Sequence, residues 1–330
     1  MNNKLVDKYG RQLNYLRLSV TDRCNFRCYY CMPEEGINFS RRQDLLSFDE
    51  MLLLSDVFCR LGVSKIRITG GEPFVRNGIM PFLKKLSGTQ GLSEITVTSN
   101  GTLSDKYQVQ LKQMGITKIN ISLDSLSRDR FMHITRRDDF ENVYAGIFKL
   151  LDNGFKVKLN CVVADNKNIQ DIIPFIDLTR NYALSVRFLE EMPFNGSDGS
   201  QVLSDWNYRR IQEYIAAHYT EVTPLINEDS STSVNYKIPG YEGSFGIIPS
   251  FSRTFCGTCN RIRLSATGEL RTCLYGPSAA NLRDILRSGA TIEEIEKCII
   301  AAVSAREANG FDAEAANNGA THTSMSVLGG

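Results

Sequence analysis

The sequence lacks a pronounced net charge, a long hydrophobic run and all but three histidines. Its 38 Lys and Arg residues against 37 Asp and Glu leave a formal charge of +1, which argues against a nucleic-acid-binding or membrane-surface protein. No apolar run approaches the roughly 20 residues that span a membrane, and the residues from Met1 to Lys4 form no signal-peptide pattern. We therefore expect a cytoplasmic protein without nucleic-acid or membrane partners.

Cysteine, in contrast, is abundant for a cytoplasmic chain, in which disulfides are rare. Six of the nine cysteines form two groups of three, namely Cys24, Cys28 and Cys31, and Cys256, Cys259 and Cys273. A structural zinc site needs four ligands, and no fourth cysteine or histidine lies near the first group. Two groups of three thiols indicate metal binding rather than disulfides.

Short strand-like runs alternate with helical patterns as far as about residue 190. The predicted strands are Tyr15–Val20, Lys65–Thr69, Ile95–Thr98, Lys118–Leu123, Lys156–Val163 and Ser185–Leu189. The predicted helices between them are Phe48–Leu61, Ile79–Leu86, Lys106–Met114, Val143–Leu151 and Ile172–Arg180. This alternation implies parallel strands with right-handed crossovers. We predict an α/β fold, with a partial, open β/α barrel in residues 1–195 and a smaller C-terminal domain in residues 196–330 that carries the second cysteine group.

The C-terminal region gives weaker signals. Helices are predicted at Trp206–His218, near Asn281–Leu286 and at Ile292–Val303, and a linker is predicted at Pro193–Ser204. The tail from Arg306 is rich in Ala, Asn and Gly, so we expect it to be mobile.

Apolar and polar residues alternate within the predicted strands, as where Leu16 and Leu18 flank Arg17. Crossover helices need an apolar sheet face, so the aliphatic set should point outward and the polar set inward. An ordinary eight-stranded barrel is filled by bulky apolar residues, and a polar lumen instead indicates a polar ligand. An antiparallel sheet with one wet face would show the same alternation and is the alternative.

The first cysteine group directly follows the first predicted strand, as Cys24-Asn-Phe-Arg-Cys28-Tyr-Tyr30-Cys31. In a β/α barrel this places three thiols at the C-terminal mouth, where such folds carry out chemistry. Three thiolates can hold a [4Fe–4S] cluster whose fourth iron stays open to another ligand. The segment Gly70-Gly71-Glu72-Pro73 ends the second strand nearby, and its glycines allow close approach to a ligand. A zinc loop and a simple tight turn are the alternatives.

The second group, Cys256-x-x-Cys259 followed by Cys273, also offers three thiols. Five cations accompany it on inward strand positions, namely Arg17, Arg67, Lys158, Arg261 and Arg263. Together they would suit a polyanion such as a triphosphate. For any one of them, a surface salt bridge is the alternative.

The spacing of Cys24, Cys28 and Cys31 resembles the radical S-adenosylmethionine superfamily, and Gly70–Pro73 resembles its methionine-binding segment. Further segments resemble the GTP 3′,8-cyclase family of molybdenum cofactor biosynthesis. They are Tyr9–Arg11, Tyr15–Cys24, Cys31–Pro33, Ile121–Leu126, Arg187–Pro193, Phe255–Leu274 and Met325–Gly330. The stretch Asn309–Thr323 departs from that family, since it has no Lys or Arg where basic residues are usual, and this leaves docking of the tail open.

The resemblance implies two [4Fe–4S] clusters and S-adenosylmethionine as cofactors, and conversion of GTP to (8S)-3′,8-cyclo-7,8-dihydroguanosine 5′-triphosphate. Its implied cluster ligands are Cys24, Cys28 and Cys31 for the first cluster, and Cys256, Cys259 and Cys273 for the second, which binds substrate. Implied S-adenosylmethionine contacts are Tyr30, Gly71, Ser122 and Met192, and implied GTP contacts are Arg17, Arg67, Thr98, Lys158, Arg261 and Arg263. The implied catalytic residues are Arg17, Arg261, Arg263, Gly329 and Gly330.

The implied partners are an electron donor and the cyclic pyranopterin monophosphate synthase that would receive the product, while a homodimer is left open. Another radical S-adenosylmethionine reaction, such as peptide modification, is the alternative within the superfamily. A non-catalytic metal protein is the alternative outside it, and it predicts closed sites with four ligands.

Overall fold

The computed structural model describes residues 4–194, 205–227, 229–317 and 323–329. Its strands are β1 (Tyr15–Ser19), β2 (Lys65–Thr69), β3 (Glu94–Ser99), β4 (Lys118–Ser122), β5 (Lys156–Val163), β6 (Ser185–Glu190), β7 (Thr223–Pro224), β8 (Val234–Lys237), β9 (Ser244–Ile248), β10 (Arg261–Leu264), β11 (Glu269–Arg271) and β12 (Ala280–Asn281). Its helices are α1 (Phe48–Arg60), α2 (Ile79–Leu86), α3 (Ser104–Gln113), α4 (Arg128–Thr135), α5 (Phe140–Asp152), α6 (Ile172–Leu178), α7 (Tyr208–Ala216), α8 (Leu282–Arg287), α9 (Ile292–Ser304), α10 (Gly310–Ala316) and α11 (Met325–Leu328).

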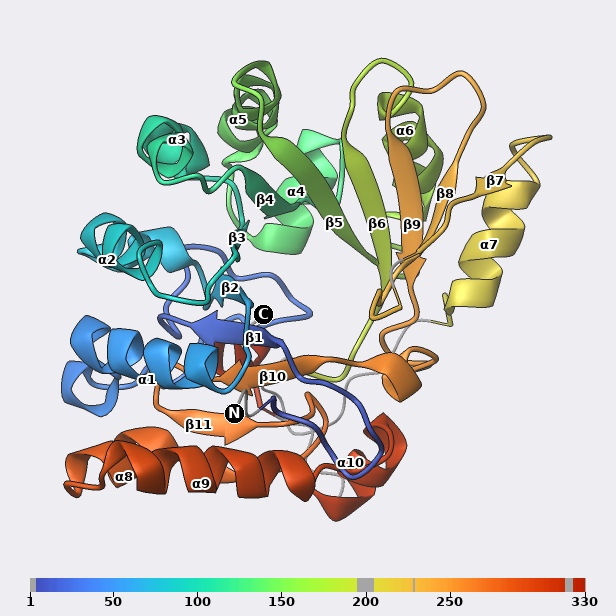
Figure 1. Ribbon diagram of the computed structural model, residues 1–330. Helices are drawn as coiled ribbons and strands as arrows, with labels where there is room; N and C mark the ends of the chain where they lie inside the picture. Colours follow the sequence, from blue (N-terminus) through green and yellow to red (C-terminus); the bar gives the residue numbers. More distant parts are fainter. Residues whose placement is uncertain (1–3, 195–204, 228, 318–322, 330) are drawn as a thin grey trace.

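The described strands form one sheet in the order β12-β11-β10-β1-β2-β3-β4-β5-β6-β9-β8-β7. Strands β1 to β6 are parallel to their neighbours, and β10 and β9 extend this parallel set beside β1 and β6. The antiparallel alternative is therefore wrong for the central strands. The sheet curves into a partial barrel, with α1, α2, α3 and α5 along its outer side and α8 and α9 next to β11 (Figure 1).

Strands from both sides of residue 195 contribute to this sheet, because β9 and β10 continue the barrel at its two edges. The division into domains at residue 195 stays a prediction. The predicted linker Pro193–Ser204 falls mainly on residues 195–204, outside the described part of the chain. Among the helices that the structure describes, none has the length and apolar character needed to cross a bilayer.

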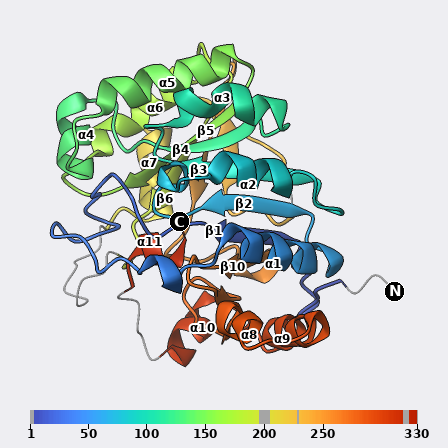
Figure 2. The ribbon, with the colours of Figure 1, turned by 90° about the vertical axis from the view of Figure 1, so that its left-hand side faces the viewer.

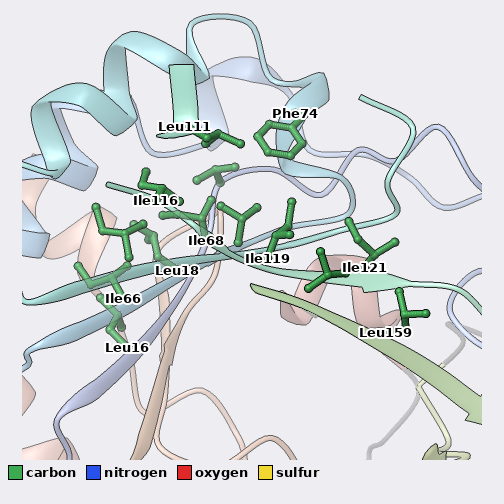
Figure 3. Close-up of a cluster of buried hydrophobic side chains, with 14 of the residues drawn as sticks. Leu16, Leu18, Ile66, Ile68, Phe74, Leu111, Ile116, Ile119, Ile121 and Leu159 are labelled. Carbon is green, nitrogen blue, oxygen red and sulfur yellow. The ribbon is translucent and has the colours of Figure 1, made fainter. Parts of the chain in front are cut away.

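The outer face of the sheet carries the hydrophobic core. Leu16, Leu18, Ile66 and Ile68 are completely buried and point toward the covering helices, as do residues of β4 and β5 (Figure 3). Leu111 of α3 closes the cluster from the helix side. Because the aliphatic half of each strand is used outside, the polar half faces the barrel interior, as the alternation predicted.

One helix was missed and one local prediction is wrong. Helix α4 was not predicted, because Arg128–Thr135 mixes charged and apolar residues with little periodicity. The prediction of a mobile tail from Arg306 is wrong for the described residues there. Arg306 and Ala313 are buried, and the tail forms α10 and α11 against the rest of the chain (Figure 2). The composition of this tail did not reveal the distant residues that hold it in place.

Candidate active site in the barrel cavity

A cavity of about 770 Å³ lies inside the partial barrel and brings the predicted site residues together. This volume is typical of a small-molecule site. Its lining includes both cysteine groups, Cys24, Cys28, Cys31, Cys256, Cys259 and Cys273. It also includes the other predicted residues of the barrel, Arg17, Tyr30, Arg67, Gly71, Thr98, Ser122, Lys158, Met192, Arg261 and Arg263.

Three arginines occupy adjacent positions on neighbouring strands of the cavity wall. Arg17 on β1 is in register with Arg67 on β2 and with Arg263 on β10. Burial and the neighbouring Arg263 charge lower the pKa of Arg17 well below its ordinary value, and burial lowers the pKa of Arg263 to about 10. Like charges side by side in a sheet destabilise it, so this row favours a bound anion.

On the strands that follow β2 in the sheet, the wall offers hydroxyl and amide groups and the amine of Lys158. Thr98, Asn120 and Lys158 are in register on β3, β4 and β5, and Ser122 is in register with Asn160. Within the described residues, Thr98 Oγ1, Asn160 Oδ1 and Arg17 Nε are buried without a hydrogen-bond partner. Buried polar atoms are nearly always paired, so these atoms indicate that the cavity receives a polar ligand.

The first cysteine group sits in a loop that begins just after β1. The Gly70–Pro73 segment is bonded to the residues before it, since the Gly71 N–H donates to Thr21 O at 2.7 Å and the Glu72 N–H to Arg23 O at 2.8 Å. A Cβ on Gly71 would collide with the Arg23 carbonyl, so only glycine allows this approach. The sequence therefore folds the two motifs against each other at the carboxyl ends of β1 and β2.

The surroundings of the thiols in this loop disfavour the thiolate form. Burial and the Glu72 charge raise the pKa of Cys24 to about 11, and burial and the Cys24 charge raise that of Cys31 to about 12. Without a metal these thiols are protonated, while bound iron supplies the positive charge that deprotonates them. Next to them, Tyr30 Oη donates to Asp124 Oδ2 at 2.7 Å, which fixes the ring at the cavity wall.

The second group surrounds the entry to β10. Cys256–Thr258 forms a short 3-10 turn, Cys259 follows it, and Cys273 comes after β11. Burial acts to raise the pKa of Cys259, but the guanidinium groups of Arg306 and Arg261 outweigh it and lower the pKa to about 7. Strand β10 begins two residues after Cys259, and its Arg261 and Arg263 lie on the inward face and line the cavity.

Neither group has the geometry of a single-ion site. Among the described residues, no three Cys, His, Asp or Glu side chains converge closely enough to hold one metal ion. A cubane cluster has a separate iron for each thiolate, so its three cysteines need not meet at one point. Three thiols per group, lining one polar cavity, fit a [4Fe–4S] cluster with one open iron.

The C-terminal tail reaches this cavity although its stretch Asn309–Thr323 has no Lys or Arg. The Gly329 carbonyl accepts from Thr69 Oγ1 at 3.1 Å and from Arg263 Nη1 at 3.2 Å, and Ser324 Oγ donates to Cys31 O at 2.6 Å. Docking of the tail, which the sequence left open, is present in the structure. Gly330, the other predicted tail residue, lies outside the described residues.

Several cavity residues were missed by the sequence analysis. Lys65, Asn160 and Arg187 share the inward strand parity that identified Arg17, so the same signal could have found them. The other missed cations are Arg11, Arg253 and Arg306, which lie in irregular segments where no periodicity marks the side that faces the cavity.

Glu72 leads to a prediction about pH. Burial raises its pKa from 4.5 to about 7, against hydrogen bonds from Asn100, Phe74 and Ser99 that lower it. The folded state therefore holds this proton more tightly than the unfolded state. Stability from this group is fully present below pH 4.5 and is lost as the pH rises through about 7, by roughly 3 kcal/mol.

Urea unfolding of the metal-free reduced protein checks this prediction. Glu72→Gln should resemble the parent protein at pH 5 and exceed it in unfolding free energy at pH 8. An equal difference between the two proteins at both pH values would contradict the expected titration of Glu72.

Two family models match the chain. The Radical SAM superfamily matches residues 18–179, and Molybdenum Cofactor Synthesis C matches residues 184–311. By structure, SuiB of Streptococcus suis, crystallised with S-adenosylmethionine, gives a TM-score of 0.58 at 16% identity, covering 84% of this chain and 67% of SuiB. At this identity the likeness shows the fold alone.

Curated relatives match most of the chain. Molybdenum cofactor biosynthesis protein 1 of Mus musculus is 43% identical over 91% of this chain, which spans 47% of that protein, so the chain is about half as long as this and similar relatives. GTP 3′,8-cyclase of Petrotoga mobilis is 40% identical, with 90% of this chain and 93% of that protein covered. The mitochondrial GTP 3′,8-cyclase of Arabidopsis thaliana is 39% identical, with 93% and 79% covered.

Proposed function

This chain belongs to the GTP 3′,8-cyclase family, and from that membership and the cavity we propose that it converts GTP to (8S)-3′,8-cyclo-7,8-dihydroguanosine 5′-triphosphate. This is the first step of molybdenum cofactor biosynthesis. The observation that carries the proposal is that two sets of three thiols line the same cavity as the row of Arg17, Arg67 and Arg263. A radical-generating site and a triphosphate site in one chamber are what the cyclisation requires.

In this proposal, Cys24, Cys28 and Cys31 hold the cluster that binds S-adenosylmethionine, and Tyr30, Gly71, Ser122 and Met192 contact that cofactor. When bound and reduced, this pair would supply a 5′-deoxyadenosyl radical that takes the ribose 3′ hydrogen of GTP as 5′-deoxyadenosine forms. The ribose carbon would then bond to C8 of guanine, and one further electron from the donor and one proton would complete the product. Cys256, Cys259 and Cys273 hold the second cluster, whose open iron offers a place for guanine.

The cationic residues position GTP between the two thiol loops. Arg17, Arg67 and Arg263 present planar guanidinium groups that match phosphate oxygens, and their partial burial strengthens the attraction of each charge to an anion. Thr98, Lys158 and Arg261 contribute further donors from the same cavity wall. Holding the triphosphate at one fixed place limits where the ribose can lie, and this directs the 3′ position toward the adenosyl group.

The docked tail takes part in this arrangement. Gly329 has a left-handed backbone with φ of 82°, and a Cβ there would clash with the side chain of Ser19. Only glycine therefore lets the tail lie against β1 with its carbonyl on Arg263. We propose that Gly329 orients Arg263 toward the substrate, while a catalytic role for Gly330 stays a prediction.

Deleting Gly329 and Gly330 is expected to lower turnover by roughly tenfold to a hundredfold, because Arg263 loses a positioning partner. Gly329→Ala should act in the same direction, since its Cβ displaces the tail. Iron and sulfide content should stay at the parent level in both variants. Unchanged turnover in the truncated protein would contradict the proposed role of the tail.

The proposed chemistry requires partners. An electron donor must reduce the first cluster, and the cyclised triphosphate would pass to the cyclic pyranopterin monophosphate synthase of the same pathway. We place the reaction in the cytoplasm.

A nucleotide comparison tests the function. The protein is reconstituted anaerobically with iron and sulfide, then supplied with S-adenosylmethionine, reductant and either GTP, GMP or ATP. We expect 5′-deoxyadenosine and a product isomeric with GTP, both largely confined to the GTP reaction. Equal 5′-deoxyadenosine formation without nucleotide would reject GTP as the substrate, and its absence from fully loaded protein would favour a non-catalytic metal protein.

A further inference from the structure

Two segments far apart in the sequence meet next to the second cysteine loop, where Arg11 and Arg306 also line the cavity. Asp7 and Arg11 lie before β1, whereas Arg306 follows α9, and these residues are only 5%, 8% and 5% exposed. The proposed ligands and the barrel core use none of the three. Burying a charge costs folding free energy unless the charge is paired, so the pairing and purpose of these three residues have to be explained.

Arg11 connects three backbone carbonyls. Its Nη1 donates to Cys256 O at 3.0 Å and to Ala308 O at 2.5 Å, and its Nη2 donates to Glu307 O at 2.7 Å. The rigid guanidinium fork therefore ties the start of the cysteine turn to the segment after α9.

Asp7 and Arg306 complete the network. Arg11 Nε donates to Asp7 Oδ2 at 2.5 Å, and the Arg11 N–H donates to Asp7 Oδ1 at 3.0 Å. Arg306 Nη1 donates to Cys259 O at 2.7 Å and lies 4.0 Å from the same carboxylate. One buried carboxylate thus serves two arginines, and each arginine holds the carbonyl of one cysteine.

The turn itself is weakly bonded. The Cys256 N–H donates to Arg253 O at 3.3 Å, and the Cys259 N–H donates to Cys256 O at 3.3 Å. Both distances are beyond the usual range for N–H···O hydrogen bonds. The shorter bonds to Cys256 O and Cys259 O come from Arg11 and Arg306, so the conformation of the turn is held from outside.

We propose that Asp7, Arg11 and Arg306 are positioning residues that hold the Cys256–Cys259 turn in the shape required by its iron–sulfur cluster. This inference rests on the proposed function, because it takes the second cysteine group as cluster ligands. Outer partners of metal ligands orient those ligands, and their loss costs about tenfold to a hundredfold in metal affinity or activity.

Two triple variants of the 330-residue chain, each keeping one cysteine group, allow the two clusters to be studied separately. In the first, Cys24→Ser, Cys28→Ser and Cys31→Ser leave only the second group, and in the second, serines replace Cys256, Cys259 and Cys273. Arg11→Lys and Arg306→Lys are then introduced, because lysine keeps the charge and loses the guanidinium fork. After anaerobic loading with iron and sulfide, iron content, the EPR spectrum of the reduced protein and iron release to a chelator are measured.

We expect Arg11→Lys to release iron roughly tenfold faster and to alter the EPR spectrum in the first background, with no change in the second. Arg306→Lys should act in the same direction, and it keeps the test valid if Arg11→Lys does not fold. Arg287→Lys is the matched control, because Arg287 also joins a carboxylate, Glu50, to two distant carbonyls and lies away from the cavity. Its iron release should match that of the parent.

Equal iron release from the parent and both lysine variants in the first background would overturn the positioning network while leaving the cluster assignment intact. Equal acceleration in both backgrounds would also overturn it, since that would show general destabilisation. If the first background without further substitution bound no iron, the cluster assignment in the proposed function would fail, and this inference would fall with it.

Discussion

Cys24→Ala is expected to reduce 5′-deoxyadenosine formation at least about a thousandfold, which corresponds to a barrier about 4 kcal/mol higher. Cys24 lies in the cavity-lining loop with Cys28 and Cys31, and the structure offers no substitute thiol among the described residues of that loop. With one ligand missing, the cubane cannot be held with its remaining iron open to S-adenosylmethionine. Quantifying 5′-deoxyadenosine by mass spectrometry after anaerobic reconstitution measures the effect.

Cys298→Ala provides the matched control. Cys298 lies on α9, outside the cavity lining, and packs partly buried against the hydrophobic core. Its replacement should leave 5′-deoxyadenosine formation near the parent level. Comparable activity in Cys24→Ala and Cys298→Ala would show that the first cysteine group does not generate the radical.

Arg17→Met is expected to weaken GTP binding by about tenfold to a hundredfold, since a hydrogen bond to a charged group contributes roughly 1.5–3 kcal/mol. The same substitution should stabilise the ligand-free protein by about 1 kcal/mol, because it removes the central charge of the row formed with Arg67 and Arg263. Equilibrium GTP binding and urea unfolding measure the two effects, which have opposite signs.

Arg130→Met tests whether weaker GTP binding combined with higher stability is specific to arginines of the cavity. Arg130 lies outside the cavity lining and forms a bidentate pair with buried Asp171, with distances of 2.8 Å and 2.7 Å. Its loss should destabilise the protein and leave GTP binding unchanged, because a buried carboxylate loses its cation. If Arg17→Met also destabilised the ligand-free protein, the row would be a structural feature instead of an anion site.

The barrel strands could be predicted from sequence because two independent signals agree there. These are the alternation of strands with helices along the chain and the alternation of apolar with polar residues within each strand. Strands β2 and β5 have the predicted limits. The orientation of Arg17 and Arg67 toward the cavity follows from the polar–apolar alternation alone. The pairing of β10 with β1 and of β9 with β6 was not predicted, because it joins segments far apart in the chain. Such pairings depend on tertiary packing, which a local period does not encode.

The tail shows the opposite case, in which composition was misleading. An Ala- and Asn-rich stretch has little intrinsic reason to be ordered, and the residues that fix it come from elsewhere. Arg11 binds Glu307 O and Ala308 O, and Arg253 donates to Gly310 O at 2.9 Å. The cysteine groups were identified from spacing, whereas the arginines that support the second group were found only in the structure.

The most direct test of the central claim uses GTP labelled with deuterium at the ribose 3′ position. Reconstituted protein is incubated anaerobically with this GTP, S-adenosylmethionine and reductant, and both products are examined by mass spectrometry. The account predicts 5′-deoxyadenosine that carries deuterium, together with a cyclised nucleotide that has lost it from the 3′ carbon. Unlabelled 5′-deoxyadenosine formed in equal amount with and without GTP would contradict the assignment of this chain as a GTP 3′,8-cyclase.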